Sequence, residues 1–278
     1  MKIIDTHCHP YLNRKKSLND ILENFFKNSG EAMIIIGTDL ENSLESVKIA
    51  KQNKNIFVTI GIHPCDIGKL DLEETIEKLE NIYKENKEKI VAIGEIGLDY
   101  YRIEKDSEKF FESGKIKDKQ KYISETKIKQ KYFFEAQINL AKKLNLPIVI
   151  HNRESKDDIF EILKKLDFKN FVFHCFSENL NFAEKLLDFA PNAMISFSGI
   201  VTFKSAENVR EAAKNLPLKN ILAETDSPYL TPVPFRGKQE NEPIFTRYVI
   251  EEIANLRNEN VEKIAESIFQ NSKNFFNI

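Results

Sequence analysis

Short runs of β-branched and apolar residues recur along the chain, separated by longer segments of mixed polarity. Eight runs predict strands, at Ile3–Asp5, Ala32–Gly37, Ile56–Ile60, Ile90–Gly94, Pro147–Ile150, Phe171–Phe173, Ala193–Phe197 and Ile221–Ala223. They are almost continuously apolar rather than alternating, which is typical of parallel strands buried on both faces. Most begin about 22 to 34 residues apart, the length of a strand–helix unit.

The intervening segments place apolar residues at the i, i+3 and i+4 spacing of amphipathic helices. The predicted helices are Ser43–Gln52, Leu72–Glu85, Phe133–Leu144, Lys156–Leu166, Leu180–Phe189 and Ala206–Asn215. Asp71 followed by Glu74 resembles a capping box at the start of the second of these. Eight strands alternating with helices favour a (β/α)₈ TIM barrel of one domain, residues 1–278, over a doubly wound open sheet.

One segment, Arg102–Lys131, breaks the spacing between the fourth and fifth strands. It contains ten Lys/Arg and six Asp/Glu with Gly114 near its middle, so it is locally basic in a chain of net charge −2. Mixed charges of this kind are typical of a solvated helical hairpin or a flexible loop. The functional alternative is a lid or a basic lip over the mouth of the barrel.

The amino-acid composition is typical of a globular protein and does not indicate a particular reaction. The 278 residues are 41% hydrophobic and 30% charged, as in ordinary globular proteins, and the small net charge gives no global basic field. Three cysteines suit a reducing compartment better than a disulfide framework. The N-terminus has no apolar run of signal-peptide length, and no apolar run in the chain is long enough to span a membrane. We therefore expect a cytoplasmic protein without membrane contact, with a monomer favoured.

Four of the five histidines lie at or just after the predicted ends of strands one, five and six. His7 and His9 are two residues apart on a strand, so both side chains project to one face while Cys8 points away. His151 and His174 end strands five and six. In a barrel, the carboxyl ends of the strands surround one mouth, where active sites of this fold lie.

Two carboxylates, Glu95 and Asp226, end strands four and eight and converge on the same mouth. Each residue alone has an ordinary explanation, such as a surface histidine or a turn-capping aspartate. Four imidazoles and two carboxylates buried together without a cation would be costly, so the joint arrangement predicts metal binding. Mixed nitrogen and oxygen ligands suit Zn²⁺, Mn²⁺ or Fe²⁺ better than Ca²⁺. Six ligands suit two ions, with Glu95 shared between them. His7, His9, Asp226 and Glu95 would surround one ion, with Glu95, His151 and His174 around the other.

Motifs distributed over nearly the whole chain resemble the TatD family of metal-dependent deoxyribonucleases, among the amidohydrolase-like barrels. They are DTHCH (5–9), GIHP (61–64), GEIGLDYY (94–101), IHNRES (150–155), HCFS (174–177), SFSGIVTF (196–203), ETDSPYLTPVPFRGK (224–238) and NEP (241–243). The resemblance implies a (β/α)₈ barrel, two divalent metal ions (Mg²⁺, Mn²⁺ or Zn²⁺) and phosphodiester hydrolysis. It also implies 3′-directed exonuclease action on DNA, on single strands or 3′ ends.

In the expected mechanism a metal-activated water attacks the phosphodiester, with Asp226 and Glu95 as catalytic residues. His63, Arg153 and Arg236 are candidates for holding phosphate, and Tyr100 for stacking a base. Arg153 could instead form a surface ion pair with Glu154 or Asp157.

Two further residues of the C-terminal motif have expected roles. Phe235 could stack a base or anchor its own loop, and Glu224 is expected to contact a ligand residue on the same face as Asp226. Two other functions remain open at this point: an esterase, amidase or deacylase for a small substrate, and a barrel without enzymatic activity.

Overall fold

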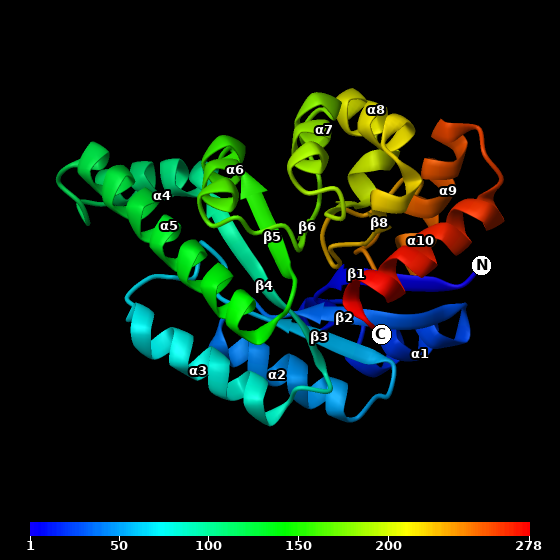
Figure 1. Ribbon diagram of the computed structural model, residues 1–278, viewed down its shortest axis with the longest axis horizontal. Coiled ribbons are helices and arrows are strands. Elements are labelled where there is room, and N and C mark those ends of the chain that lie inside the picture. The colour runs from blue at the N-terminus through cyan, green and yellow to red at the C-terminus, as the bar shows by residue number, and fades with distance from the viewer.

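Eight parallel strands surround the centre of the molecule, which a computed structural model describes for all residues 1–278 (Figure 1). The strands are β1 Ile3–Cys8, β2 Gly30–Ile36, β3 Ile56–Ile60, β4 Ile90–Asp99, β5 Ile148–Arg153, β6 Phe171–Phe173, β7 Met194–Phe197 and β8 Ile221–Ala223. They pair in sequence order from β1 to β8. A parallel bridge between Cys8 and Ser227 joins the two edges, so the sheet is a nearly closed barrel. The predicted (β/α)₈ architecture is confirmed, and the open-sheet alternative is wrong.

Helices follow the strands and cover the barrel from outside (Figure 1). They are α1 Leu18–Lys27, α2 Leu40–Lys51, α3 Leu72–Glu85, α4 Tyr100–Glu112, α5 Lys119–Leu144, α6 Lys156–Lys165, α7 Leu180–Phe189, α8 Glu207–Asn215, α9 Thr246–Arg257 and α10 Val261–Phe276. The predicted helix at 72–85 begins after Asp71, whose side chain accepts a hydrogen bond from the Glu74 backbone amide. Helices α1, α9 and α10 were not predicted from the sequence.

The apolar residues of the strands form two sets because successive side chains point to opposite faces. One set, including Ile35 and Val58, packs against the helices in the large outer core. The other, including Ile34 and Val149, forms a separate cluster inside the barrel with Phe276 at the end of α10. The apolar interior fills the barrel near the beginnings of the strands and leaves polar residues to the opposite mouth.

The charged segment between β4 and β5 forms a helical hairpin of α4 and α5, which projects beyond the barrel at the left of Figure 1. Of the two predicted forms, the helical hairpin is therefore the observed one. The helix predicted at 133–144 is the second half of the 26-residue α5. Lys127 pairs with Glu104 and Lys119 with Glu108, so ion pairs between the two helices help to hold the hairpin together.

Two strands contain an extra residue immediately before the polar mouth. Asp5 and Cys8 of β1 pair with Met33 and Ile35, so a three-residue step faces a two-residue step on β2. Ile93 and Ile96 of β4 pair in the same manner with Ile148 and Ile150 of β5. Such bulges redirect side chains and are frequent beside active sites. Glu95 lies within the second bulge, so the prediction that it ends its strand is wrong: β4 continues to Asp99.

No helix in the structure is long and apolar enough to cross a membrane.

Candidate metal centre

His7 and His9 project from β1 towards Asp226, which follows β8. The His7 Nε2 and His9 Nε2 atoms each lie 3.6 Å from Asp226 Oδ1. The backbone positions this group, because the Asp226 amide donates to the His7 carbonyl at 2.9 Å across the barrel seam. As expected for an alternating strand, Cys8 points the other way, and its thiol contacts the Ile34 carbonyl.

Glu95 lies between His7, His151 and His174. Its Oε1 atom is 2.8 Å from His174 Nε2 and 2.7 Å from His151 Nδ1, and its Oε2 atom is 3.4 Å from His7 Nε2. The His7 and His174 rings are stacked with centroids 3.9 Å apart. One carboxylate therefore reaches histidines from three strands.

Burial and charge set the protonation of this cluster. Burial by itself would raise the pKa of Glu95, but neighbouring histidines, with His174 first, hold that pKa well below its ordinary value. Burial lowers the pKa of His7, and the adjacent His174 lowers it further. The pKa of His174 is raised well above its ordinary value because Glu95 and Glu224 outweigh burial. The carboxylate of Glu95 is consequently ionised at neutral pH, as a metal ligand must be.

The unpartnered nitrogens fit a cation. Both ring nitrogens of His7 and the Nδ1 atom of His9 are buried without any hydrogen-bond partner. Three groups of potential ligands converge within 4.8 Å: His7–His9–Asp226, His7–Glu95–His174 and His63–Glu95–His151. Buried polar atoms without partners are costly, and imidazole with carboxylate is a usual donor set for divalent transition metals. The residues present thus suit a divalent metal centre of the predicted composition.

Carboxylates behind two of the histidines orient their rings. Glu224 Oε1 lies 3.2 Å from His174 Nδ1 and also accepts the Cys175 backbone amide at 2.7 Å. Asp99 Oδ2 lies 3.3 Å from His151 Nε2. In each histidine the nitrogen farther from Glu95 (Nδ1 of His174, Nε2 of His151) can donate to a carboxylate. The nitrogen nearer to Glu95 is then free to act as a ligand. The expected contact between Glu224 and a ligand residue is present.

Asp99 was not singled out from the sequence, although it is part of the GEIGLDYY motif. It ends β4, and its other oxygen caps α4 by accepting the Arg102 amide at 2.7 Å. Its own amide donates to Gln130 Oε1 of α5 at 3.0 Å. The α4–α5 hairpin therefore fixes the position of a carboxylate that touches His151.

His63, assigned to phosphate binding, reaches the same cluster with its Nε2 atom 3.7 Å from Glu95 Oε1. Burial and the neighbouring His151 lower its pKa to about 3, so the ring is neutral. Its Nδ1 atom accepts the Cys65 amide at 3.1 Å, which places the single ring proton on Nε2. His63 thus presents an N–H donor to the centre.

Neither of the two arginines proposed to hold phosphate forms an ion pair. The guanidinium of Arg153 lies 3.9 Å from the Tyr101 ring centroid, and that of Arg236 lies 3.7 Å from the Phe203 ring centroid. The alternative pairing of Arg153 with Glu154 or Asp157 is absent. Stacking on an aromatic ring leaves the in-plane N–H groups available to an anion.

The geometry does not support base stacking by Tyr100. Tyr100 is 8% exposed, its hydroxyl donates to Asp158 at 2.5 Å and Lys127 lies over its ring. Phe235 is stacked on Phe245 with ring centroids 4.9 Å apart, so of its two possible roles the structure shows loop anchoring.

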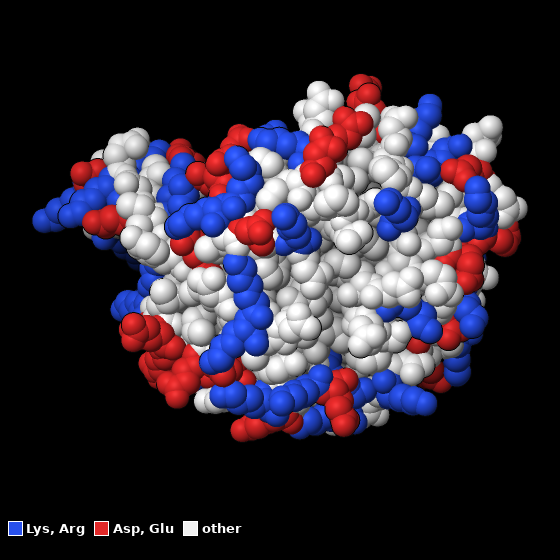
Figure 2. Space-filling view, viewed as in Figure 1, with Lys and Arg blue, Asp and Glu red and all other residues white.

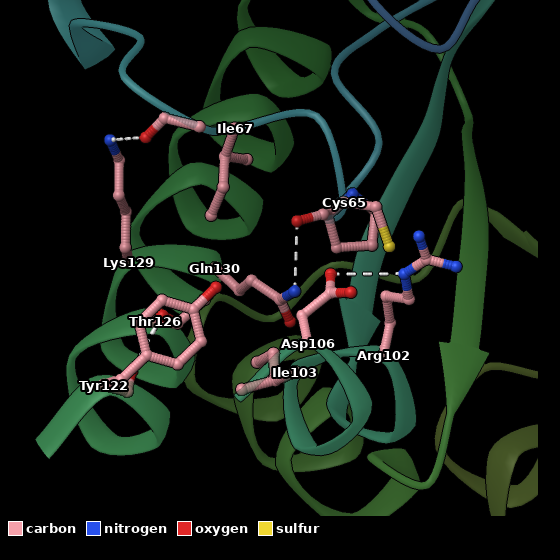
Figure 3. Close-up of a pocket in the computed structure, with 11 residues that line it drawn as sticks. Cys65, Ile67, Arg102, Ile103, Asp106, Tyr122, Thr126, Lys129 and Gln130 are labelled. Carbon is pink, nitrogen blue, oxygen red and sulfur yellow. Dashed lines mark hydrogen bonds and ion pairs between the residues drawn. The ribbon is translucent and has the colours of Figure 1, made fainter. Parts of the chain in front are cut away.

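A separate pocket of about 250 Å³ lies between the hairpin and the loop after β3, and Figure 3 shows its lining. Gln130 donates to the Pro64 carbonyl, Lys129 to the carbonyls of Gly68 and Leu70, and Arg102 pairs with Asp106. Each of these side chains already has a hydrogen-bond or ion-pair partner, so the pocket has little free hydrogen-bonding capacity. Cys65 forms part of the pocket wall. Its Sγ atom lies 3.7 Å from Asp99 Oδ2, on the side of the pocket that faces the histidine cluster.

Comparison with known proteins agrees with this centre. The sequence profile of the family described as TatD related DNase matches residues 4–277. The uncharacterized metal-dependent hydrolase YabD of Bacillus subtilis is 35% identical over 282 residues, covering 99% of each chain. The corresponding YcfH protein of Escherichia coli is 35% identical over 284 residues, covering 100% of this chain and 97% of the relative.

Solved structures show the same fold. The TatD homolog YJJV of Escherichia coli superimposes with a TM-score of 0.83 at 27% identity, covering 99% of this chain and 98% of that one. A TatD family hydrolase of Entamoeba histolytica superimposes with a TM-score of 0.77 at 20% identity, covering 99% of this chain and 98% of that one.

A histidine–carboxylate cluster at the mouth of an α/β barrel, in a chain whose relatives are metal-dependent hydrolases, defines the class: this protein is a metal-dependent hydrolase. Within that class the chain belongs to the TatD family.

Proposed function

We propose that this hydrolase is a deoxyribonuclease that removes nucleotides from the 3′ end of single-stranded DNA. The observation that carries the proposal is the combination, at one barrel mouth, of the histidine–carboxylate cluster with two unpaired guanidinium groups, Arg153 and Arg236. Free guanidinium groups suit phosphate, which a neutral ester or amide substrate lacks. The family description, TatD related DNase, supports the same bond type.

We further propose that this cluster would hold two divalent metal ions. The residues that would hold them are His7, His9, Glu95, His151, His174 and Asp226. When bound, such ions lower the pKa of a water molecule and polarise a phosphoryl oxygen.

The chain's own residues then position the substrate and move the proton of the attacking water. Nearby His9 and His7 hold the pKa of Asp226 below its ordinary value in spite of burial, so its carboxylate is ionised. Its Oδ1 atom faces both histidines, which leaves Oδ2 to accept the proton of the attacking water as the new P–O bond forms. The same carboxyl group then returns that proton to the oxygen that leaves when the scissile P–O bond breaks. The Nε2–H group of His63 donates to a non-bridging phosphoryl oxygen, and Arg153 and Arg236 hold the flanking phosphates.

The test is hydrolysis of a single-stranded oligonucleotide labelled at its 5′ end. Metal-stripped protein is resupplied with Mg²⁺, Mn²⁺ or Zn²⁺, and Asp226→Ala and Glu95→Ala are compared with the exposed-surface control Glu211→Ala. We expect a metal-dependent ladder that shortens from the 3′ end in the wild type and the control, and no ladder in the two cluster variants.

Other outcomes would contradict the proposal in different ways. Cleavage that persists in both cluster variants would show that the cluster is not the site of cleavage. Absence of cleavage, together with metal-dependent turnover of small esters or amides, would establish the small-substrate alternative.

A further inference from the structure

One face of α4 carries three residues at helical spacing, Tyr101, Lys105 and Lys109. Positions i, i+4 and i+8 lie nearly above one another, separated by about 6 Å along the helix axis. Lys105 and Lys109 are exposed, and Tyr101 is partly exposed. The helix thus presents one aromatic ring followed by two cations in a row.

These cations have no carboxylate partner. The Lys105 ammonium lies 5.0 Å from the Tyr101 ring centroid, and the Arg153 guanidinium lies 3.9 Å from the same centroid. Two positive groups therefore share one ring without an anion between them. Arg102, on the adjacent side of α4, is instead neutralised by Asp106 (Figure 3). Like charges brought together in this manner favour an external anion.

The row begins at the metal centre. Arg153 pairs in register with Asp99, whose carboxylate touches His151. From there α4 leads outwards along the projecting hairpin, and Figure 2 shows basic side chains at its far end. Lys115 and Lys117 lie in that connecting turn, beyond Lys109.

Of the four acidic residues of α4, Glu104 is paired with Lys127 and Asp106 with Arg102. Glu108 is paired with Lys119 of α5 at 3.1 Å, so its charge is compensated. Glu112 is the last residue of the helix and follows Lys109. The stretch between Arg153 and Lys109 consequently keeps a positive charge.

We propose that Arg153, Tyr101, Lys105 and Lys109 form a strand track, a surface that binds a single nucleic-acid strand as it leaves the metal centre. The cations contact successive phosphates, and the exposed part of the Tyr101 ring supports a neighbouring base or sugar. A single row of cations on one helix follows one strand and does not span a duplex. The track rests on the proposed nuclease function and adds to it a binding surface outside the metal centre.

The test measures binding separately from cleavage. Fluorescence anisotropy of labelled single strands of about three and about twelve nucleotides is recorded with the Asp226→Ala protein, alone and with Lys105→Ala/Lys109→Ala added. The matched control is Lys214→Ala/Lys219→Ala, which removes two exposed lysines where α8 ends and the chain enters β8, at the opposite end of the barrel.

We expect the track variant to weaken binding of the long strand by roughly fivefold, the effect of losing two exposed ion pairs. Binding of the short strand changes less, since fewer of its phosphates can contact the two lysines at the same time. The slope of log Kd against log salt concentration falls by about 1.4 for the long strand, about 0.7 for each lost phosphate contact. The control variant binds both strands as the parent does.

The outcomes separate the track from the nuclease. Equal binding by the parent and the track variant, or equal losses in the track and control variants, would overturn the track even if the enzyme cleaves DNA. If long strands bind better than short ones and this binding needs Lys105 and Lys109, but the wild-type enzyme cleaves no strand, the track would be supported and the nuclease function overturned. A parent that binds no strand overturns the track.

Discussion

The Asp99 carboxylate lies 3.3 Å from the far nitrogen of His151, whose near nitrogen is 2.7 Å from Glu95. Burial raises the pKa of Asp99, but its contact with His151 more than offsets that effect and holds the pKa below the ordinary value. An ionised Asp99 accepts the Nε2 proton, so Nδ1, which faces Glu95, is the nitrogen that can give up its proton to a cation. Asp99 is therefore a positioning residue that fixes both the tautomer and the orientation of His151.

Replacing Asp99 by Asn should weaken metal binding by about 10- to 100-fold, the usual effect of losing such a partner. The protein should remain folded, because Asn can still cap α4. Isothermal titration of metal-stripped protein measures the affinity, and Asp106→Asn, on the same helix but facing Arg102, is the control. Unchanged affinity in Asp99→Asn would show that His151 needs no such partner.

Metal should stabilise the wild type, because its ligands converge only in the folded chain. At a free metal concentration 100-fold above Kd, the free energy of unfolding should rise by about 2.7 kcal/mol. Glu95→Gln removes the carboxylate that reaches four of the five histidines and should abolish most of this gain. Thermal unfolding with and without metal measures both. A full metal-induced shift in Glu95→Gln would place the metal elsewhere.

Gly97 should be indispensable for stability. Its φ is +150°, and a Cβ atom there would lie 2.0 Å from the His151 carbonyl oxygen on the neighbouring strand. Gly97→Ala should therefore destabilise the protein by about 2–4 kcal/mol, measured by denaturant unfolding. Gly114→Ala is the matched control, since Gly114 also has positive φ but open space around it, and should cost about 1 kcal/mol. Equal effects would show that backbone conformation, not the contact with His151, decides the cost.

His63 should make stability depend on pH in the metal-free protein. The unfolded chain protonates this residue below its ordinary pKa of 6.5, whereas the folded chain does so only near a pKa of about 3. Between these values the unfolded state binds more protons, so the free energy of unfolding falls as the pH is lowered from 6.5 towards about 3. His63→Asn should reduce this slope by up to about 1.4 kcal/mol per pH unit. An NMR titration in which the His63 ring protonates near pH 6.5 would contradict the prediction.

Much of the fold was predictable because its signals are local. The apolar runs around Ile34 and Val149 indicate buried parallel strands without reference to any neighbour, and all eight predicted strands are present. Helices α9 and α10 were missed although their buried residues, such as Ile264 and Ile268, follow helical spacing.

Strand-end residues of the chain were enough to predict most of the side chains that meet at the mouth. His7, Glu95 and Asp226 lie at or near the ends of parallel strands, and the closed topology brings those ends together. The tertiary structure alone decided how they meet. Asp99 contacts His151 across 52 positions of sequence, and the orientation of Glu95 depends on the extra residue within β4. Contacts of this kind depend on strand register and bulges, which result from packing of the whole barrel and leave no periodic pattern in the chain.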